Sequence, residues 1–368
     1  MTGKAPGLLG KWLFIYPNPA NKRNPNLRHI VFTDSSDERL AGKEPGSRIS
    51  DSGIPVYEVN DIAESGTLFI HCESGRFTLE GDHVLGMFAQ MRSLETIEGL
   101  EKIDMSSVTS LNNTFLNCTS LREVSLRGWN TSNVTKMRNL FDSCKNLKQV
   151  DMSGLETGAV KDMSGMFTDC SSLEQVFLTG WDTSNVLDMS SMFQRCKSLT
   201  ELDLSDFSVD RSTNMKAMFN GCESLQSIVL NDWETQGVTT MDHMFSRCKS
   251  LENASFCTWW NTENVRDMSH MFEGCENLKE LDLSGFDTSK VWFMQRMFRD
   301  CKSLETINLS AATTPLSPKT WDMFEGCESL KEVRLSPHPM AARSLKAAAK
   351  TQIAKSITEN RTAHADAR

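Results

Sequence analysis

Cysteine has the widest chemical scope of the residues in this chain, which holds 11 cysteines among 368 residues. A thiolate can act as a nucleophile or bind zinc, but no two cysteines stand in the C-x-x-C spacing of a zinc site. Nine of them recur at a regular interval: Cys118, Cys144, Cys170, Cys196, Cys222, Cys248, Cys275, Cys301 and Cys327. The regularity favours buried thiols that pack as small apolar groups, and leaves disulfides between neighbours open. Cys72 and Cys257 fall outside the series and are the expected exposed thiols.

Histidine offers the other candidate chemistry. His243 and His270 stand at equivalent places 27 residues apart, where two imidazoles could share a metal. Only two ligands are evident, so we expect no metal and no cofactor. The neighbours His71 and Cys72 do not make a nucleophile pair by sequence alone, because such pairs are set by spatial geometry. No phosphate loop, H-E-x-x-H or G-x-S-x-G motif occurs, so we expect no catalytic residues. An enzyme built on residues 1–84 is the alternative.

The period that positions the nine cysteines is 26 residues, with a single step of 27 between Cys248 and Cys275. A Phe precedes each of the nine by three residues, and a Leu follows each by three. Agreement at both offsets in every unit is typical of a stacked repeat protein. The extra residue of the long step lies near the tryptophan pair Trp259-Trp260.

Each unit combines two hydrophobic patterns. Leu202 and Leu204 alternate with polar residues, which indicates a short strand. Val186, Met189 and Met192 are spaced by three, which places them on one side of a short helix or 3₁₀ turn. The predicted fold is therefore a leucine-rich-repeat-like solenoid, with a parallel β-sheet on one face and short helical or 3₁₀ turns on the other.

Three regions follow from the extent of the repeat. Residues 1–84 lack it, and within them Thr67–Cys72 and Arg76–Leu79 are predicted to form a β-hairpin that caps the first unit. Residues 85–336 form the solenoid, with nine clear repeats and one degenerate repeat. Residues 337–368 are predicted to be an Ala/Lys-rich helical cap followed by a basic disordered tail.

The composition limits the partners. A net charge of −9 argues against nucleic acid. The chain has no run of 18 apolar residues, so we expect no membrane span. A protein or a glycan is the expected partner, and the chain is expected to be a monomer.

The outward face of the predicted sheet is the natural binding surface of such a solenoid. It is polar and acidic, and Phe177 and Val229 are its apolar exceptions, with Asp203 on the unit between them. An apolar spot ringed by polar groups is the usual anatomy of a binding hot spot. The candidate binding residues are Phe177, Val229, Asp151, Glu201, Asp203, Glu280 and Asp282.

The units carry a family resemblance in the segments Trp181-Asp182-Thr183-Ser184-Asn185-Val186, Asp188-Met189-Ser190-Ser191-Met192-Phe193 and Leu202-Asp203-Leu204-Ser205. Over about residues 85–336 they resemble the mycoplasma-lipoprotein-type repeat, which is grouped with the BspA-type leucine-rich-repeat surface proteins. The resemblance implies a surface or secreted adhesion protein without catalytic residues. The sequence departs from that pattern because it shows no secretory signal peptide, lipobox or cell-wall anchor, which leaves a cytoplasmic location open. The alternative is an intracellular or injected effector that binds its target through the solenoid or the basic C-terminal tail.

Overall fold

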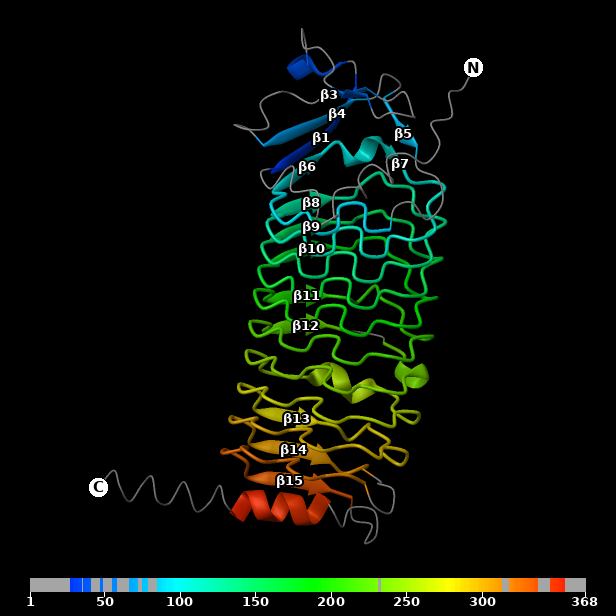
Figure 1. Ribbon diagram of the computed structural model, residues 1–368. Helices are drawn as coiled ribbons and strands as arrows, with labels where there is room; N and C mark the ends of the chain where they lie inside the picture. The colour runs from blue at the N-terminus through cyan, green and yellow to red at the C-terminus, as the bar shows by residue number, and fades with distance from the viewer. Residues whose placement is uncertain are drawn as a thin grey trace, which may run out of the picture. The chain divides into compact units, whose positions relative to one another are not determined.

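The computed structural model describes residues 27–34, 36–40, 47–48, 55–57, 66–71, 75–78, 85–230, 233–312, 318–336 and 345–354. The chain divides into two compact units, Met1–Asp182 and Thr183–Arg368. Each unit is a stack of similar turns of the chain (Figure 1). We call each turn a rung, and one rung corresponds to one sequence repeat. The predicted leucine-rich-repeat-like solenoid is confirmed.

Short parallel strands form one side of each stack. In the first unit these are β8 (Glu123–Ser125), β9 (Gln149–Asp151) and β10 (Gln175–Phe177). In the second they are β11 (Glu201–Asp203), β12 (Ser227–Val229), β13 (Glu280–Asp282), β14 (Thr306–Leu309) and β15 (Glu332–Leu335). Paired residues stand one period apart, as in Val124↔Val150 and Leu202↔Ile228. These central residues are buried and their neighbours face outward, as the alternation predicts.

The opposite side of each rung differs from the predicted short helix. It is a succession of turns in which two residues adopt left-handed backbone angles, such as Asn113 (φ 60°) and Asn117 (φ 61°). A left-handed residue cannot continue a right-handed helix. The backbone N–H groups bond to the next rung instead, as Phe115 N does to Leu140 O at 2.9 Å. A second ladder of parallel bridges results, which includes Ser110↔Lys136 in the first unit and Asp188↔Asn214 in the second.

Phenylalanine and methionine fill the interior. The Phe rings of successive rungs stack nearly parallel, with centroids 4.9 Å apart for Phe115 and Phe141 and 5.3 Å apart for Phe219 and Phe245. The fully buried Met side chains include Met137, Met163, Met166, Met189, Met192, Met215, Met218, Met241, Met244, Met268, Met271, Met294 and Met297. The spacings of three that suggested a helix therefore mark inward positions on the turns.

The cysteine ladder lies beside the phenylalanines. Within each compact unit, the thiols donate to the carbonyl of the Phe one rung earlier, as Cys144 Sγ does to Phe115 O at 3.1 Å and Cys222 Sγ to Phe193 O at 3.1 Å. None of the ten described cysteines is in a disulfide, and all ten are buried. The expected exposure of Cys257 is wrong, because this thiol is fully buried in a 3₁₀ helix. Cys72 lies outside the described residues.

The predicted hairpin is also wrong. Strand β4 (Thr67–His71) pairs in parallel with β1 (His29–Thr33) and antiparallel with β3 (Pro55–Tyr57). Strand β1 also pairs with β6 (Thr96–Glu98), so the stack continues past the first sequence repeat. The short strand β5 (Phe77–Thr78) pairs with β7 (Ile103–Asp104). Consecutive buried residues such as Ile30, Val31 and Phe32 are typical of a parallel strand covered on both faces.

The remaining elements are short. They are β2 (Ser47–Arg48), which pairs with β3, the 3₁₀ helices η1 (Glu38–Leu40), η3 (Leu100–Lys102), η4 (Thr235–Gly237) and η5 (Ser255–Trp259), and a helix over 345–354. The last lies within the stretch where the sequence predicts a helical cap. Its Leu345 and Ala349 are buried, and Gln352 Nε2 donates to Cys327 O at 3.3 Å. None of the helices in the described ranges has the length and apolar character that a membrane span requires.

Candidate functional site

The two apolar residues predicted for the sheet face do point outward. Phe177 ends β10 and is 41% exposed, and Val229 ends β12 and is 37% exposed. Phe177 belongs to the first unit and Val229 to the second. Their role in binding stays a prediction.

Three of the acids on that face have a structural role that the sequence reading did not assign. One carboxylate oxygen of each of Asp151, Asp203 and Asp282 accepts a hydrogen bond from the backbone N–H two residues later, at 2.9–3.0 Å. The bonds from Ser205 lower the pKa of Asp203, and those from Ser284 lower the pKa of Asp282. Such bonds close the turn after a strand. Glu201 and Glu280 are exposed on the same face.

A different site appears where the repeat is one residue longer. At that rung, the helix η5 stands where the other rungs have their β-strand. The residue that precedes η5, Ala254, is not extended, because its backbone angles are φ −135° and ψ 43°. Backbone bonds from Cys257 N to Ala254 O and from Trp260 N to Cys257 O, at 3.1 and 3.2 Å, hold the 3₁₀ turns. The local helix replaces the strand and places Trp259 and Trp260 next to each other at its end.

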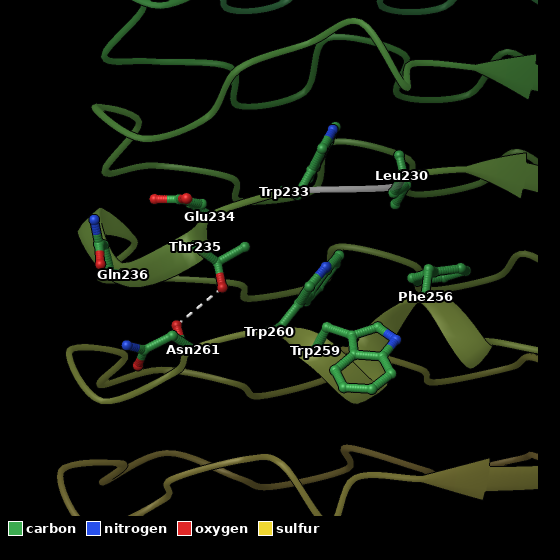
Figure 2. Close-up of a pocket in the computed structure, with 9 residues that line it drawn as sticks. All are labelled: Leu230, Trp233, Glu234, Thr235, Gln236, Phe256, Trp259, Trp260 and Asn261. Carbon is green, nitrogen blue, oxygen red and sulfur yellow. Dashed lines mark hydrogen bonds between the residues drawn. The ribbon is translucent and has the colours of Figure 1, made fainter.

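A pocket of about 610 Å³ opens beside this helix, and we call it the tryptophan pocket. Its lining residues are Leu230, Trp233, Glu234, Thr235, Gln236, Phe256, Trp259, Trp260 and Asn261 (Figure 2). The indoles of Trp233 and Trp260 stack at 6.1 Å and are almost fully buried. Trp259 is 89% exposed, whereas tryptophan side chains in folded proteins are mostly buried. The pocket therefore has an aromatic floor and a free aromatic face at its edge.

The buried indole of Trp260 carries an unused hydrogen-bond donor. At equivalent places, Trp129 Nε1 donates to Leu100 O at 2.8 Å and Trp233 Nε1 to Leu204 O at 3.2 Å. Trp260 Nε1 is buried and finds no acceptor among the described residues. A buried donor without a partner costs about 1–3 kcal/mol. Because Nε1 is fully buried, a ligand with an acceptor would recover that free energy only if the side chains that cover the atom moved aside.

The rim of the pocket is polar. Glu234, Gln236 and Asn261 are exposed, and Thr235 Oγ1 donates to Asn261 O at 2.9 Å, which fixes the two sides of the rim. Among the described residues that line the pocket there is neither a cysteine nor a histidine, and Glu234 is the one ionisable side chain.

The 27-residue step and the Trp259-Trp260 pair are visible in the sequence, but the predicted binding surface was the strand face. The signal was there, since an insertion beside two adjacent tryptophans breaks a pattern that otherwise alternates inward and outward residues. What the sequence did not reveal is which indole turns inward and that its N–H loses its acceptor.

Comparison with known proteins gives a family and distant structural likenesses. A model of the family described as "Mycoplasma protein of unknown function, DUF285" matches residues 83–178, 173–259 and 213–336. No curated protein matches the sequence.

Three solved structures illustrate the structural likeness. A chain of the TLR13–ssRNA13 complex is 19% identical, with 70% of this chain and 41% of that chain covered and a TM-score of 0.28. An LRR protein of Leptospira interrogans is 14% identical, with 85% and 79% covered and a TM-score of 0.26. A chain of the Toll–Spatzle complex of Drosophila is 13% identical, with 75% and 42% covered and a TM-score of 0.28. The match spans less than half the length of the chains from the first and third structures.

Proposed function

This chain belongs to the family of Mycoplasma proteins of unknown function called DUF285, and from that premise we propose that it is a non-catalytic binding protein whose ligand occupies the tryptophan pocket. A leucine-rich-repeat-like solenoid is a scaffold for interaction. The observation that carries the proposal is the buried Trp260 N–H, which has no acceptor among the residues that the structure describes, next to the exposed face of Trp259.

The chemistry of the pocket favours a glycan as the ligand. A sugar ring offers an apolar C–H face that can lie on an indole, and hydroxyl groups that both donate and accept hydrogen bonds. Trp259 supplies the flat apolar surface, and Trp260 Nε1 supplies a donor for a ring or hydroxyl oxygen. The exposed Glu234 and Gln236 supply acceptors for hydroxyl donors at the rim. A few placed polar groups around an aromatic floor are what fixes a ligand's orientation.

The outward strand face of each compact unit is a second candidate surface, for a protein partner. Phe177 and Val229 are large apolar side chains that remain exposed on otherwise polar strands. The two surfaces are compatible with one adhesion protein, and the family resemblance supports a surface or secreted location for it. The alternative is an effector that acts inside a cell, and the location of the intact chain distinguishes the two.

The test uses an array of immobilised glycans and two single variants. Trp259→Ala should lose binding by at least about tenfold, which corresponds to 1.4 kcal/mol, because it removes the stacking face. Trp292→Ala is the matched control, since Trp292 is 51% exposed on another rung and does not line the pocket. Both variants should melt as the wild-type chain does. Equal glycan binding by wild-type and Trp259→Ala chains would contradict the proposal.

A further inference from the structure

Two histidines on adjacent rungs of the second unit lie face to face. The rings of His243 and His270 are 4.2 Å apart and within 9° of parallel. Both residues have left-handed backbone angles, φ 58° and 59°, and His243 N donates to Ser269 O at 2.9 Å across the rungs. The fold thus holds the two imidazoles in register.

A carboxylate contacts Nδ1 of each ring. His243 Nδ1 lies 2.5 Å from Asp242 Oδ1, and His270 Nδ1 lies 2.8 Å from Glu273 Oε2. On His243, the carboxylate of Asp242 selects the tautomer that leaves the lone pair on Nε2, which is how ligating histidines are oriented in metal sites. On His270, the carboxylate at Nδ1 belongs to Glu273, so a cation would take the place of the hydrogen shared between Nδ1 and Oε2.

The carboxylate of Asp242 is itself fixed. The residue is 6% exposed, and its oxygens accept from Ser269 Oγ at 2.9 Å and contact Lys216 Nζ at 2.8 Å. These contacts fix the carboxylate beside the His243 ring.

The fold adds a third donor that the sequence spacing did not reveal. One donor atom from each of His243, His270 and Glu273 lies within 4.8 Å of the other two. A cation among them needs ligand distances of about 2.0–2.2 Å. Because the two rings stack face to face, an imidazole must rotate out of the stack to direct its in-plane lone pair at the ion. The three side chains are only partly buried, so an ion and its waters have access. Two imidazoles and one carboxylate suit a divalent transition metal such as zinc rather than calcium or magnesium.

We propose that His243, His270 and Glu273 form a binding site for one divalent transition-metal ion of the zinc type, with water in its remaining positions. The ion ties two adjacent rungs together and so favours the folded state. This site is separate from the tryptophan pocket, and neither proposal depends on the other.

The experiment is a calorimetric titration of the untagged full-length chain with zinc chloride, repeated with cobalt(II) and followed by its visible absorption. The wild-type chain should bind one equivalent of either metal and should melt at a higher temperature with zinc. The variant His243→Asn/His270→Asn should lose that binding. Asn is matched to the backbone, because Asn113 and Asn139 hold the same left-handed position on other rungs.

The control is Asp322→Asn, which alters the equivalent position on the second rung after His270 and removes a carboxylate that is not a ligand. It should bind metal as the wild-type chain does. Absence of binding by the wild-type chain overturns the proposal. Unchanged binding by the double histidine variant, with its melting temperature preserved in the absence of metal, overturns it as well.

Discussion

At the scale of single residues, the same side chain has different consequences on different rungs. The indole N–H groups of Trp129, Trp181 and Trp233 each donate to a backbone carbonyl, and these residues act as packing. Trp260 is equally buried but has no acceptor in the described part of the chain. Residue type and burial therefore do not identify the site, and the accounting of hydrogen bonds does.

The phenylalanine ladder makes a first prediction at this scale. Phe193→Ala should lower the free energy of unfolding by about 3–5 kcal/mol, because it leaves a cavity in a close-packed interior. Phe193 is fully buried and stacks on Phe219 at 5.9 Å. Phe177→Ala, at an exposed position, is the control and should cost far less. Urea melts measure both, and a loss below about 1 kcal/mol for Phe193→Ala would place this side chain outside the core.

The buried thiols make a second prediction. Burial raises the pKa of Cys222 to about 12 and that of Cys275 to about 12, from an unfolded value of 9.0. A group with a raised pKa in the folded state stabilises the fold fully below pH 9, and this contribution declines as the pH rises from 9 towards 12. Denaturant melts at stepped pH should show the decline, and Cys222→Ala should reduce it. Stability independent of pH over that range would contradict the assignment.

At the scale of elements, the strands were predictable and the turns were not. The alternation at Leu202 and Leu204 predicts that both side chains face the interior of the rung, and both are buried in the structure. The short helix predicted for the other side of each rung is absent from the described rungs. Apolar spacings of three also arise in a chain of turns, when residues such as Asn113 and Asn117 adopt left-handed backbone angles. The hairpin was mispredicted because local proximity favoured pairing within 67–79, whereas β4 pairs with the distant β1. Long-range pairings of this kind carry no signal in a single sequence.

The candidate site was predictable to a similar degree. The outward positions of Phe177 and Val229 follow from the two-residue period of a strand, and both side chains are exposed. The tryptophan pocket depends on η5, where one extra residue converts a strand into 3₁₀ turns. The sequence shows the insertion, but how the backbone absorbs it depends on packing against the neighbouring rungs.

The sheet face supports a prediction at the element scale. The double variant Phe177→Glu/Val229→Glu should fold normally, because both side chains end their strands in solvent. It should no longer recover the protein partner that the wild-type chain captures from a cell extract. Thermal melts and pull-downs on the same preparation measure the two effects. Unchanged melting together with unchanged recovery would exclude the sheet face as the protein-binding surface.

At the scale of the whole molecule, a repeat scaffold separates stability from recognition. Rungs bond to their immediate neighbours through both ladders, so one rung can depart from the pattern while those beside it keep their ladders. The 27-residue rung is that departure, and it carries the pocket. Recognition of the pocket's ligand is therefore proposed for the irregular rung, and the regular rungs stabilise the fold.

The most direct test observes the indole N–H groups of the chain, which has 8 tryptophans, by ¹H–¹⁵N NMR during titration with a glycan selected on the array. The Trp260 resonance, assigned by comparison with a Trp260→Phe variant, should move downfield as its N–H gains an acceptor, and that of Trp259 should shift with it. Trp129, which already donates to Leu100 O, should not move. Saturable binding that leaves the Trp259 and Trp260 resonances in place would contradict the claim that this pocket holds the ligand.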